Sequence, residues 1–142
     1  MDDVILNKSE SIKRCILRIE QDYDEEFENN YTKQDSVILN IQRAIQQAID
    51  LGAYIVKKYK FKIPKTSREI FEILFENQII DKKLSENLKK MVGFRNLAIH
   101  EYTQLNLEII KYIIQNQLWD IVEFEKIIIQ YEKGKNETKS ND

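Results

Sequence analysis

Residues 84–102 read LSENLKKMVGFRNLAIHEY, and this stretch decides the fold that we expect. Its apolar residues recur every three or four positions, which is the period of one face of an α-helix. The stripe on that face consists of Leu84, Leu88, Met91, Arg95, Ala98 and Tyr102. A charged residue therefore stands in the middle of an otherwise apolar face. An unpaired guanidinium there is costly, so we expect Arg95 to meet either a carboxylate or a cleft that receives an anion.

A second row of the same predicted helix is polar or small throughout: Lys89, Gly93, Asn96 and His100. Glycine inside a helix costs about 1 kcal/mol relative to alanine, so Gly93 indicates the close approach of a partner helix or a ligand. About 140° separates Arg95 from His100 around a straight helix. The two can serve one site only if their side chains curl towards a shared cleft, or if a symmetry-related chain completes the site.

The rest of the chain predicts an all-α protein. Three glycines and one proline in 142 residues are too few for the turns of an all-β fold. Apolar periodicity predicts five helices, at residues 3–27, 35–60, 67–77, 81–102 and 107–131. Asp35 or Ser36 is the expected N-cap of the second helix. We expect one domain over residues 1–132, followed by a polar, disordered tail at residues 133–142.

Several protein classes are excluded by composition. The chain has a single cysteine, Cys15, which cannot form an internal disulfide, so we expect a protein from a reducing compartment. Cys15 lies on an apolar stripe of the first predicted helix, so we expect it to be a small buried residue. No apolar run is long enough to span a membrane and the first residues do not resemble a signal peptide, so we expect a cytoplasmic protein.

Charge is unevenly distributed although the whole chain has a net charge of −2. Residues 1–35 carry a net charge of −5, residues 36–100 of +6 and residues 101–142 of −3. A basic middle third is compatible with a polyanionic partner, although solvated lysines on helix faces and loops are the simpler explanation of the charge alone.

The fifth predicted helix is apolar on more than one face. Residues 109–129 include eight isoleucines besides Leu118, Trp119, Val122 and Phe124, too many for one side of a helix. A five-helix chain of this size cannot easily enclose such a helix, so we expect a homodimer.

The run Arg95-Asn96-Leu97-Ala98-Ile99-His100-Glu101-Tyr102 fits the pattern Arg-x4-His-x-Tyr. With this motif late in the fourth of five helices, the chain resembles the HEPN-domain proteins, and specifically the HepT-like toxins. Residues 34–43 (QDSVILNIQR) also resemble the corresponding helix of that group. The resemblance extends over about residues 1–132. It implies a five-helix, up-and-down HEPN-like bundle that dimerises around the motif in the fourth helix.

The resemblance also implies an activity: a ribonuclease that acts on RNA without a metal or other cofactor, as the toxin of a bacterial toxin–antitoxin pair. Its implied partner is a minimal nucleotidyltransferase antitoxin, MntA-like, which transfers AMP from ATP to the motif tyrosine. Carried over by position, Arg95, His100 and Tyr102 are catalytic and Tyr102 is also the modified residue. Weaker candidates for the surrounding site are Asp35, Asn40, Arg43 and Asn96.

Two other interpretations stay open. The chain could be a non-catalytic helical partner or substrate of a nucleotidyltransferase, which presents Tyr102 without cleaving RNA. It could also be a structural bundle in which Arg95 simply pairs with an internal acid such as Asp35 or Asp50.

Overall fold

The computed structural model describes residues 2–141 of the chain, apart from the side chains of Gln104 and residues 138–141, and this part contains helices and no strand. The elements in chain order are α1 (Asp3–Asp22), η1 (Phe27–Asn29), α2 (Tyr31–Lys58), α3 (Ser67–Glu76), α4 (Lys82–His100), η2 (Tyr102–Gln104), α5 (Leu107–Asn116) and α6 (Leu118–Asn141). The predicted all-α class is confirmed, and every predicted helical segment is present.

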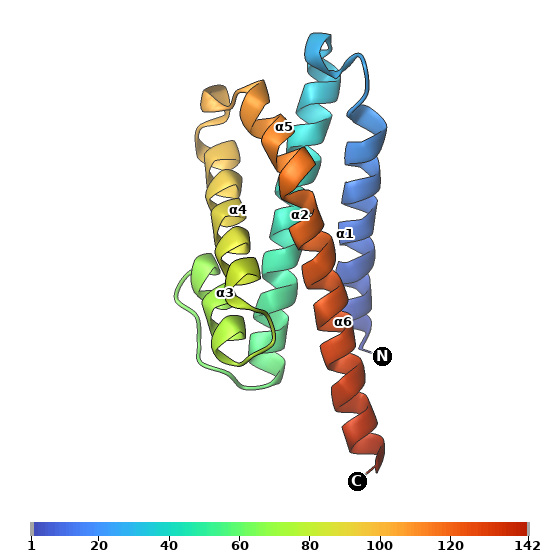
Figure 1. Ribbon diagram of the computed structural model, residues 1–142, viewed down its shortest axis with the longest axis vertical. Helices are drawn as coiled ribbons and strands as arrows, with labels where there is room; N and C mark the ends of the chain where they lie inside the picture. The colour runs from blue at the N-terminus through green and yellow to red at the C-terminus, as the bar shows by residue number, and fades with distance from the viewer. Residues whose placement is uncertain (1, 142) are drawn as a thin grey trace.

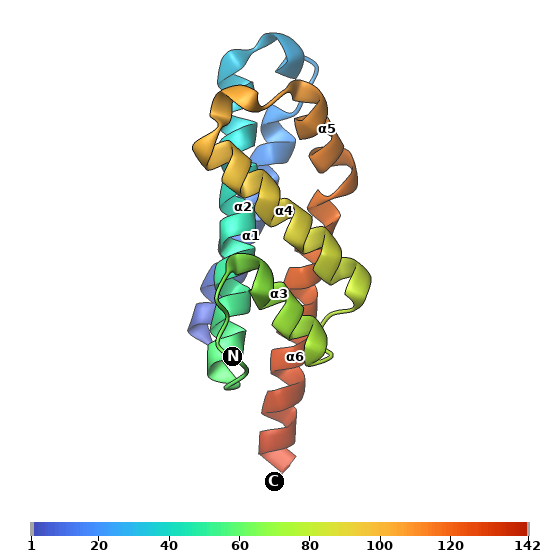
Figure 2. The ribbon, with the colours of Figure 1, turned by 90° about the vertical axis from the view of Figure 1, so that its left-hand side faces the viewer.

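The long helices α1, α2 and α6 lie side by side along the long axis of the molecule (Figure 1). Helix α4 packs on the other side of α2 from α1, so α2 is the central helix. Figure 2 shows α4 crossing the bundle obliquely, with the short α3 beside its first half. The end of α4 that carries the motif therefore lies next to the first half of α2.

The apolar stripes meet in one core. Fully buried members come from every long helix, for example Ile12, Ile41, Phe71, Met91 and Phe124. Cys15 is buried among them, as expected, and burial raises the pKa of its thiol. No helix of the described residues is long and apolar enough to cross a membrane.

Helix α2 begins earlier than expected. Asn30 is its N-cap, with Oδ1 accepting a hydrogen bond from the backbone N–H of Lys33 at 3.0 Å. The prediction that Asp35 or Ser36 caps this helix is wrong, because the Asn30 cap starts the helix at Tyr31, one turn before Asp35. The carboxylate of Asp35 is thus free for another role on the surface of α2.

The first and fourth helices end earlier than expected. Helix α1 stops at Asp22, and a single turn of 3₁₀ helix, η1, follows at residues 27–29. Helix α4 stops at His100, so Tyr102 belongs to η2 and not to α4. Tyr102 is therefore not on the continuous stripe that the sequence predicts. The shift to η2 changes the direction in which its side chain leaves the backbone.

The predicted fifth helix is divided at Gln117 into α5 and α6. Gln117 has backbone angles outside the helical range, and it still closes α5 by donating its N–H to the carbonyl of Ile113. The bend lets both halves face the core with different residues, Ile110 and Ile113 from α5 and Phe124 and Ile128 from α6.

Helix α6 continues beyond the expected end near Tyr131. Residues 133–141 form its last turns, where the sequence predicts a disordered tail. No proline interrupts this segment, and the helix continues through Gly134. Asp142 lies outside the described residues.

Candidate functional site at the end of α4

Arg95 is half-buried and makes its hydrogen bonds to neutral amides. Its Nη1 donates to Gln46 Oε1 on α2 at 2.9 Å. Its Nε and Nη2 donate to Oδ1 of the neighbouring Asn96, at 3.2 and 2.7 Å. Two neutral oxygens orient the guanidinium and leave its positive charge uncompensated.

Gln46 is in turn held by an acid. Its Nε2 donates to Asp50 Oδ1 at 2.9 Å, and Lys8 Nζ lies 3.7 Å from the other oxygen of that carboxylate. The bond to Asp50 fixes which end of the amide faces Arg95, because the carboxylate accepts only from the NH₂ end.

The interpretation that Arg95 forms a structural ion pair with Asp35 or Asp50 is not supported. Asp50 binds Gln46 and Lys8, and Asp35 binds Tyr102. Among the side chains that the structure describes, no carboxylate lies within 4.0 Å of the Arg95 guanidinium. The guanidinium of Arg95, which the sequence predicts to need an anion, is thus open to an anion from outside the protein.

His100 is the last residue of α4 and its side chain is exposed. Asn96 precedes it by one helical turn on the same row, and the guanidinium of Arg95 reaches round the helix to Asn96. The side chain of Arg95 therefore curls towards the row of His100. Arg95 and His100 lie about 140° apart around the helix, and a side chain that curls in this way is one of the two arrangements that would let them serve one site.

Tyr102 and Asp35 are brought together by the fold. The hydroxyl of Tyr102, in η2, donates to Asp35 Oδ1, in the second turn of α2. This hydrogen bond, helped by partial burial and by the negative charge of the carboxylate, raises the pKa of Tyr102 to about 12. Tyr102 as a residue is 46% exposed, so its hydroxyl is held in place at a surface that a large molecule can reach.

Asn40 and Arg43 lie on another row of α2, the one that faces α1. Ser36, on the same row, binds Asp22 of α1, and the amide of Asn40 donates to the Ser36 carbonyl at 2.9 Å. Arg43 is exposed and lowers the pKa of the nearby Cys15 thiol against the effect of burial. Within one chain, the structure does not bring these two candidates to Arg95 and Tyr102.

The sequence does not single out Gln46, the residue that holds Arg95. It lies on the row of α2 that contains Asp35, Leu39 and Gln42, and this row faces α4. Asp35 and Gln46 lie on one row at helical spacing, and this spacing could have indicated that α2 makes two polar contacts with the motif.

The sequence predicts that a partner helix or a ligand approaches Gly93. In the structure, the group that approaches Gly93 is the side chain of Arg68 from α3.

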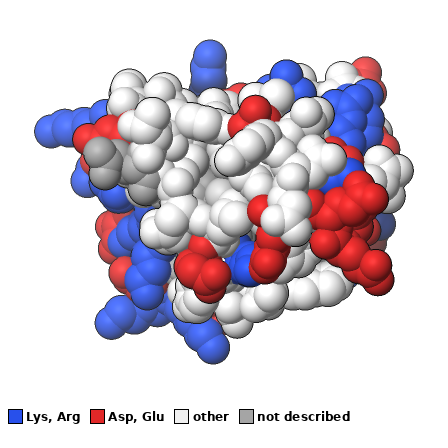
Figure 3. All heavy atoms as spheres, turned by 90° about the horizontal axis from the view of Figure 1, so that it is seen from above, with Lys and Arg blue, Asp and Glu red and all other residues white. Residues whose placement is uncertain are grey.

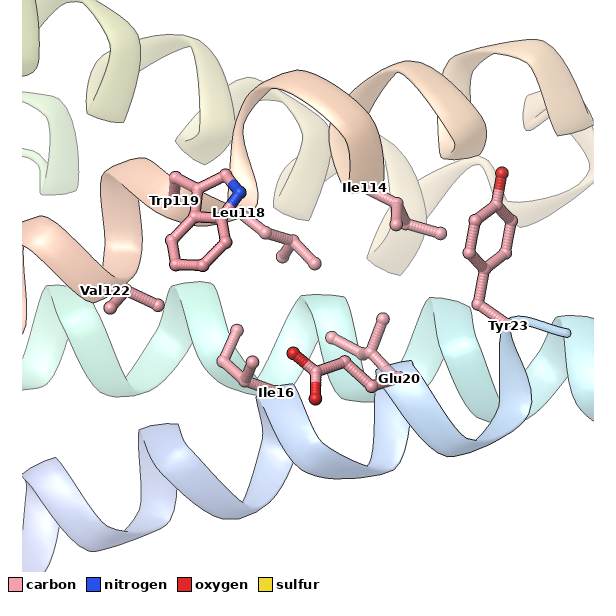
Figure 4. Close-up of a pocket in the computed structure, with 8 residues that line it drawn as sticks. Ile16, Glu20, Tyr23, Ile114, Leu118, Trp119 and Val122 are labelled. Atoms are coloured by element: carbon pink, nitrogen blue, oxygen red, sulfur yellow. The ribbon is translucent and has the colours of Figure 1, made fainter.

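An apolar pocket lies elsewhere on the molecule, between α1, α5 and α6 (Figure 4). Ile16 and Glu20 of α1 face Leu118, Trp119 and Val122 of α6 across it. Its lining comes from helices other than those that carry the motif, so this pocket is separate from the site of Arg95.

Charged side chains are unevenly placed around the end of the molecule that carries the motif. Figure 3 looks down on that end and shows Lys and Arg gathered mainly at its left-hand side, where Figure 1 places α4. Asp and Glu gather mainly on the other side. Within the described residues, no three His, Cys, Asp or Glu side chains converge as a metal site would require.

Comparison with known proteins identifies the family. The family model described as "Ribonuclease HepT-like" matches residues 8–128. The mRNA nuclease HepT of Shewanella oneidensis is 45% identical over 130 residues, which are 90% of this chain and 98% of that protein. A putative RNase of Archaeoglobus fulgidus is 34% identical over 74 residues, 52% of this chain and 55% of that protein.

Solved structures give the same result. The tri-AMPylated Shewanella oneidensis HEPN toxin in complex with its MNT antitoxin superposes with a TM-score of 0.87 at 45% identity, covering 92% of this chain and 99% of that chain. The cytosolic protein YutE of Bacillus subtilis shares only the fold, with a TM-score of 0.79 at 14% identity over 91% of this chain and 90% of that chain.

The helical fold, and its match to a solved HEPN toxin over 92% of this chain, place the chain in the HEPN class of protein. Within that class, the chain belongs to the HepT-like family.

Proposed function

We propose that this chain is a metal-independent endoribonuclease that acts as the toxin of a toxin–antitoxin pair, with Arg95 and His100 as its catalytic residues. The observation that carries the proposal is the half-buried guanidinium of Arg95, held by two neutral amides without a carboxylate. Such a group is ready to bind a phosphate. A 45% identical relative, whose full length this chain nearly covers, is named as an mRNA nuclease.

The proposed reaction uses the nucleophile that RNA carries itself. The 2′-hydroxyl attacks the adjacent phosphorus while His100 accepts its proton, since imidazole is the side chain suited to this at neutral pH. Arg95 donates hydrogen bonds to the non-bridging oxygens as negative charge builds on them. The bond from phosphorus to the 5′-oxygen breaks, and the products are a 2′,3′-cyclic phosphate and a 5′-hydroxyl.

The leaving 5′-oxygen needs a proton that the single histidine of one chain does not obviously supply. In our proposal the chain forms a homodimer around the motif, and either His100 of the partner subunit or Tyr102 donates this proton. Ile99, within the motif, and Leu39, on the row of α2 that contains Asp35 and Gln46, are exposed apolar residues that a second copy would cover. Light scattering at micromolar concentration should then give the mass of two chains.

The proposed regulation is transfer of AMP from ATP to Tyr102 by an MntA-like nucleotidyltransferase. The hydroxyl oxygen of Tyr102 attacks the α-phosphorus of ATP, pyrophosphate leaves, and Asp35 accepts the hydroxyl proton along the hydrogen bond that already exists. The attached AMP is bulky and anionic, so it would repel RNA phosphate from the site. The related HEPN toxin is tri-AMPylated in its complex with an MNT antitoxin, which supports this proposal.

The ribonuclease proposal is tested with purified protein and a single-stranded RNA oligonucleotide. We expect cleavage by the wild type in the presence of EDTA, and a loss of at least about 100-fold in Arg95→Ala and His100→Ala. Arg14→Ala removes the same charge from an exposed position on α1 and should cleave like the wild type.

Two results would overturn the proposal. Equal cleavage by all the variants would mean that the activity does not come from this site. A wild type that cleaves no RNA, yet receives AMP on Tyr102 from the transferase, would favour the non-catalytic substrate of a nucleotidyltransferase instead.

A further inference from the structure

The side chain of Arg68 reaches from the first turn of α3 to the middle of α4. Its Nε donates to the backbone carbonyl of Lys89 at 3.4 Å. Its Nη2 lies 3.0 Å from the point where a Cβ on Gly93 would stand. The absence of a side chain at Gly93 therefore gives the Arg68 guanidinium its place against α4.

That place is on the polar row that leads to the motif. Lys89, Gly93, Asn96 and His100 follow one another at helical spacing, so Arg68 lies at one end of this row and His100 at the other. Gly93 and His100 are seven residues apart, which is about 10 Å along the axis and nearly the same direction. The guanidinium of Arg95 reaches the same row between them, at Asn96.

Arg68 differs from its neighbour Lys89 in its electrostatic surroundings. Lys89 is paired with Glu72 and also lies 3.4 Å from Glu86. Arg68 is exposed, and no carboxylate lies within 4.0 Å of its guanidinium among the side chains described. Of these two cations, only Arg68 has a charge without a counter-ion on the protein.

We propose that Arg68 binds an RNA phosphate that flanks the one cleaved at Arg95 and His100. A guanidinium presents a planar set of donors that matches two phosphate oxygens, and binding sites for single-stranded RNA follow the backbone with such cations. The RNA backbone then lies along this row of α4, with the scissile phosphate at Asn96 and His100 and a neighbouring phosphate at Arg68. This inference rests on the proposed ribonuclease function.

The first test measures binding of a single-stranded RNA oligonucleotide in the His100→Ala background, where cleavage does not interfere. Arg68→Ala should weaken binding about tenfold, as expected for loss of hydrogen bonds between charged groups. The slope of log affinity against log salt concentration should also become shallower by about 0.7, which corresponds to one phosphate contact fewer. A merely structural role for Arg68 would not change this slope.

The second test uses substrate length with His100 intact. A dinucleoside monophosphate has one phosphodiester and no flanking phosphate, so Arg68→Ala should cleave it like the wild type. On the longer oligonucleotide the same variant should show a KM raised about tenfold with kcat unchanged. Arg68→Lys keeps the charge but not the planar donor set, and should recover part of the loss.

Arg14→Ala is the matched control, because it removes an exposed arginine on α1, on the far side of α2 from α4. The inference is overturned if the wild type cleaves RNA and Arg68→Ala equals Arg14→Ala on both substrates. It is also overturned if Arg68→Ala impairs the dinucleoside as much as the oligonucleotide. Absence of cleavage by the wild type would instead overturn the proposed function on which the inference rests.

Discussion

Two residues of α2 hold the side chains of Arg95 and Tyr102, and they do so by different means. Asp35 accepts a hydrogen bond from the Tyr102 hydroxyl, and Gln46 accepts one from the Arg95 guanidinium. The carboxylate raises the pKa of Tyr102 and stands where it can accept the hydroxyl proton. The neutral amide orients the guanidinium without cancelling its charge. In the proposed RNA cleavage, the uncancelled charge of Arg95 binds the phosphate that is attacked. In the proposed AMP transfer, the Tyr102 hydroxyl is the attacking group and Asp35 accepts its proton.

Gln46→Glu tests the importance of a neutral partner for Arg95. The new carboxylate should form an ion pair with the guanidinium, and RNA phosphate would have to displace it. We expect kcat/KM for RNA cleavage to fall about tenfold or more, since hydrogen bonds to charged groups are the stronger ones. Gln47→Glu adds the same charge on the neighbouring row and is the control. Unchanged cleavage by Gln46→Glu would show that Gln46 does not govern the charge at Arg95.

Asp35→Asn tests the origin of the raised pKa of Tyr102. With the negative acceptor removed, the pKa of Tyr102 should fall from about 12 towards its ordinary value of 10. An NMR titration of tyrosine labelled with ¹³C at Cζ measures this directly. AMP transfer to Tyr102 should also slow in this variant, because asparagine cannot accept the proton. Asp50→Asn, which alters the acid next to Gln46, should leave the titration of Tyr102 as it is.

At the residue scale the sequence predicts where an unusual group stands but not what it meets. Periodicity within the fourth helix correctly marks Arg95 as partly inward-facing. It gives no information on the register of α2 against α4, and that register decides that Gln46 and not Asp35 or Asp50 lies opposite Arg95. Periodicity also could not predict the direction in which the Tyr102 side chain points, because that direction depends on where α4 ends.

At the scale of elements, helix ends follow from capping side chains. Asp2, Asn30, Thr66, Asp81 and Asn106 each accept a hydrogen bond from a backbone N–H of the first turn that they precede. Asn30 was missed because Asp35 and Ser36 are equally good caps by residue type. Only the packing of η1 against α2 selects among them.

The glycines of α2 and α4 should respond to alanine in opposite ways. A Cβ at Gly52 would lie 2.8 Å from Cγ2 of Ile70 and 3.4 Å from a methyl group of Leu74, both in the core. Gly52→Ala should therefore cost about 1–3 kcal/mol of unfolding free energy. At Gly93 the contact is the tip of a flexible arginine, so Gly93→Ala should be neutral or gain up to about 1 kcal/mol. Denaturant unfolding measures both, and a stabilised Gly52→Ala would contradict the close packing of α2 on α3.

At the scale of the whole molecule, a polar cluster ties the start of α1 to the end of α2 and to α6. Lys58 bridges Asp2, at 3.0 Å, and the buried carboxylate of Glu132. Tyr54 donates to Asp2, and Tyr59 donates to Glu132. Partial burial opposes ionisation of Asp2, but the hydrogen bonds from Tyr54 and Lys58 outweigh it and lower the pKa of Asp2 to about 2. Three distant segments of the chain thus share one set of charges.

Asp2→Asn should weaken the fold in a way that depends on pH. The pKa of Asp2 is lower in the folded chain than its ordinary value of 3.8, so its contribution is complete above that value and disappears as the pH falls towards 2. We expect a loss of about 1–2 kcal/mol of unfolding free energy at pH 7, since asparagine still caps α1. Asp3→Asn, at an exposed position, is the control. Denaturant unfolding at several pH values measures the difference, and a loss that is the same at pH 7 and pH 2 would contradict this assignment.

The most direct test of the central claim is to identify the ends of the RNA that the protein produces. Mass spectrometry of a cleaved oligonucleotide should show 2′,3′-cyclic phosphate and 5′-hydroxyl ends for the wild type, and uncut RNA for Arg95→Ala and His100→Ala. Products with 3′-hydroxyl ends, or the same cyclic products from His100→Ala at the wild-type rate, would contradict cleavage by Arg95 and His100.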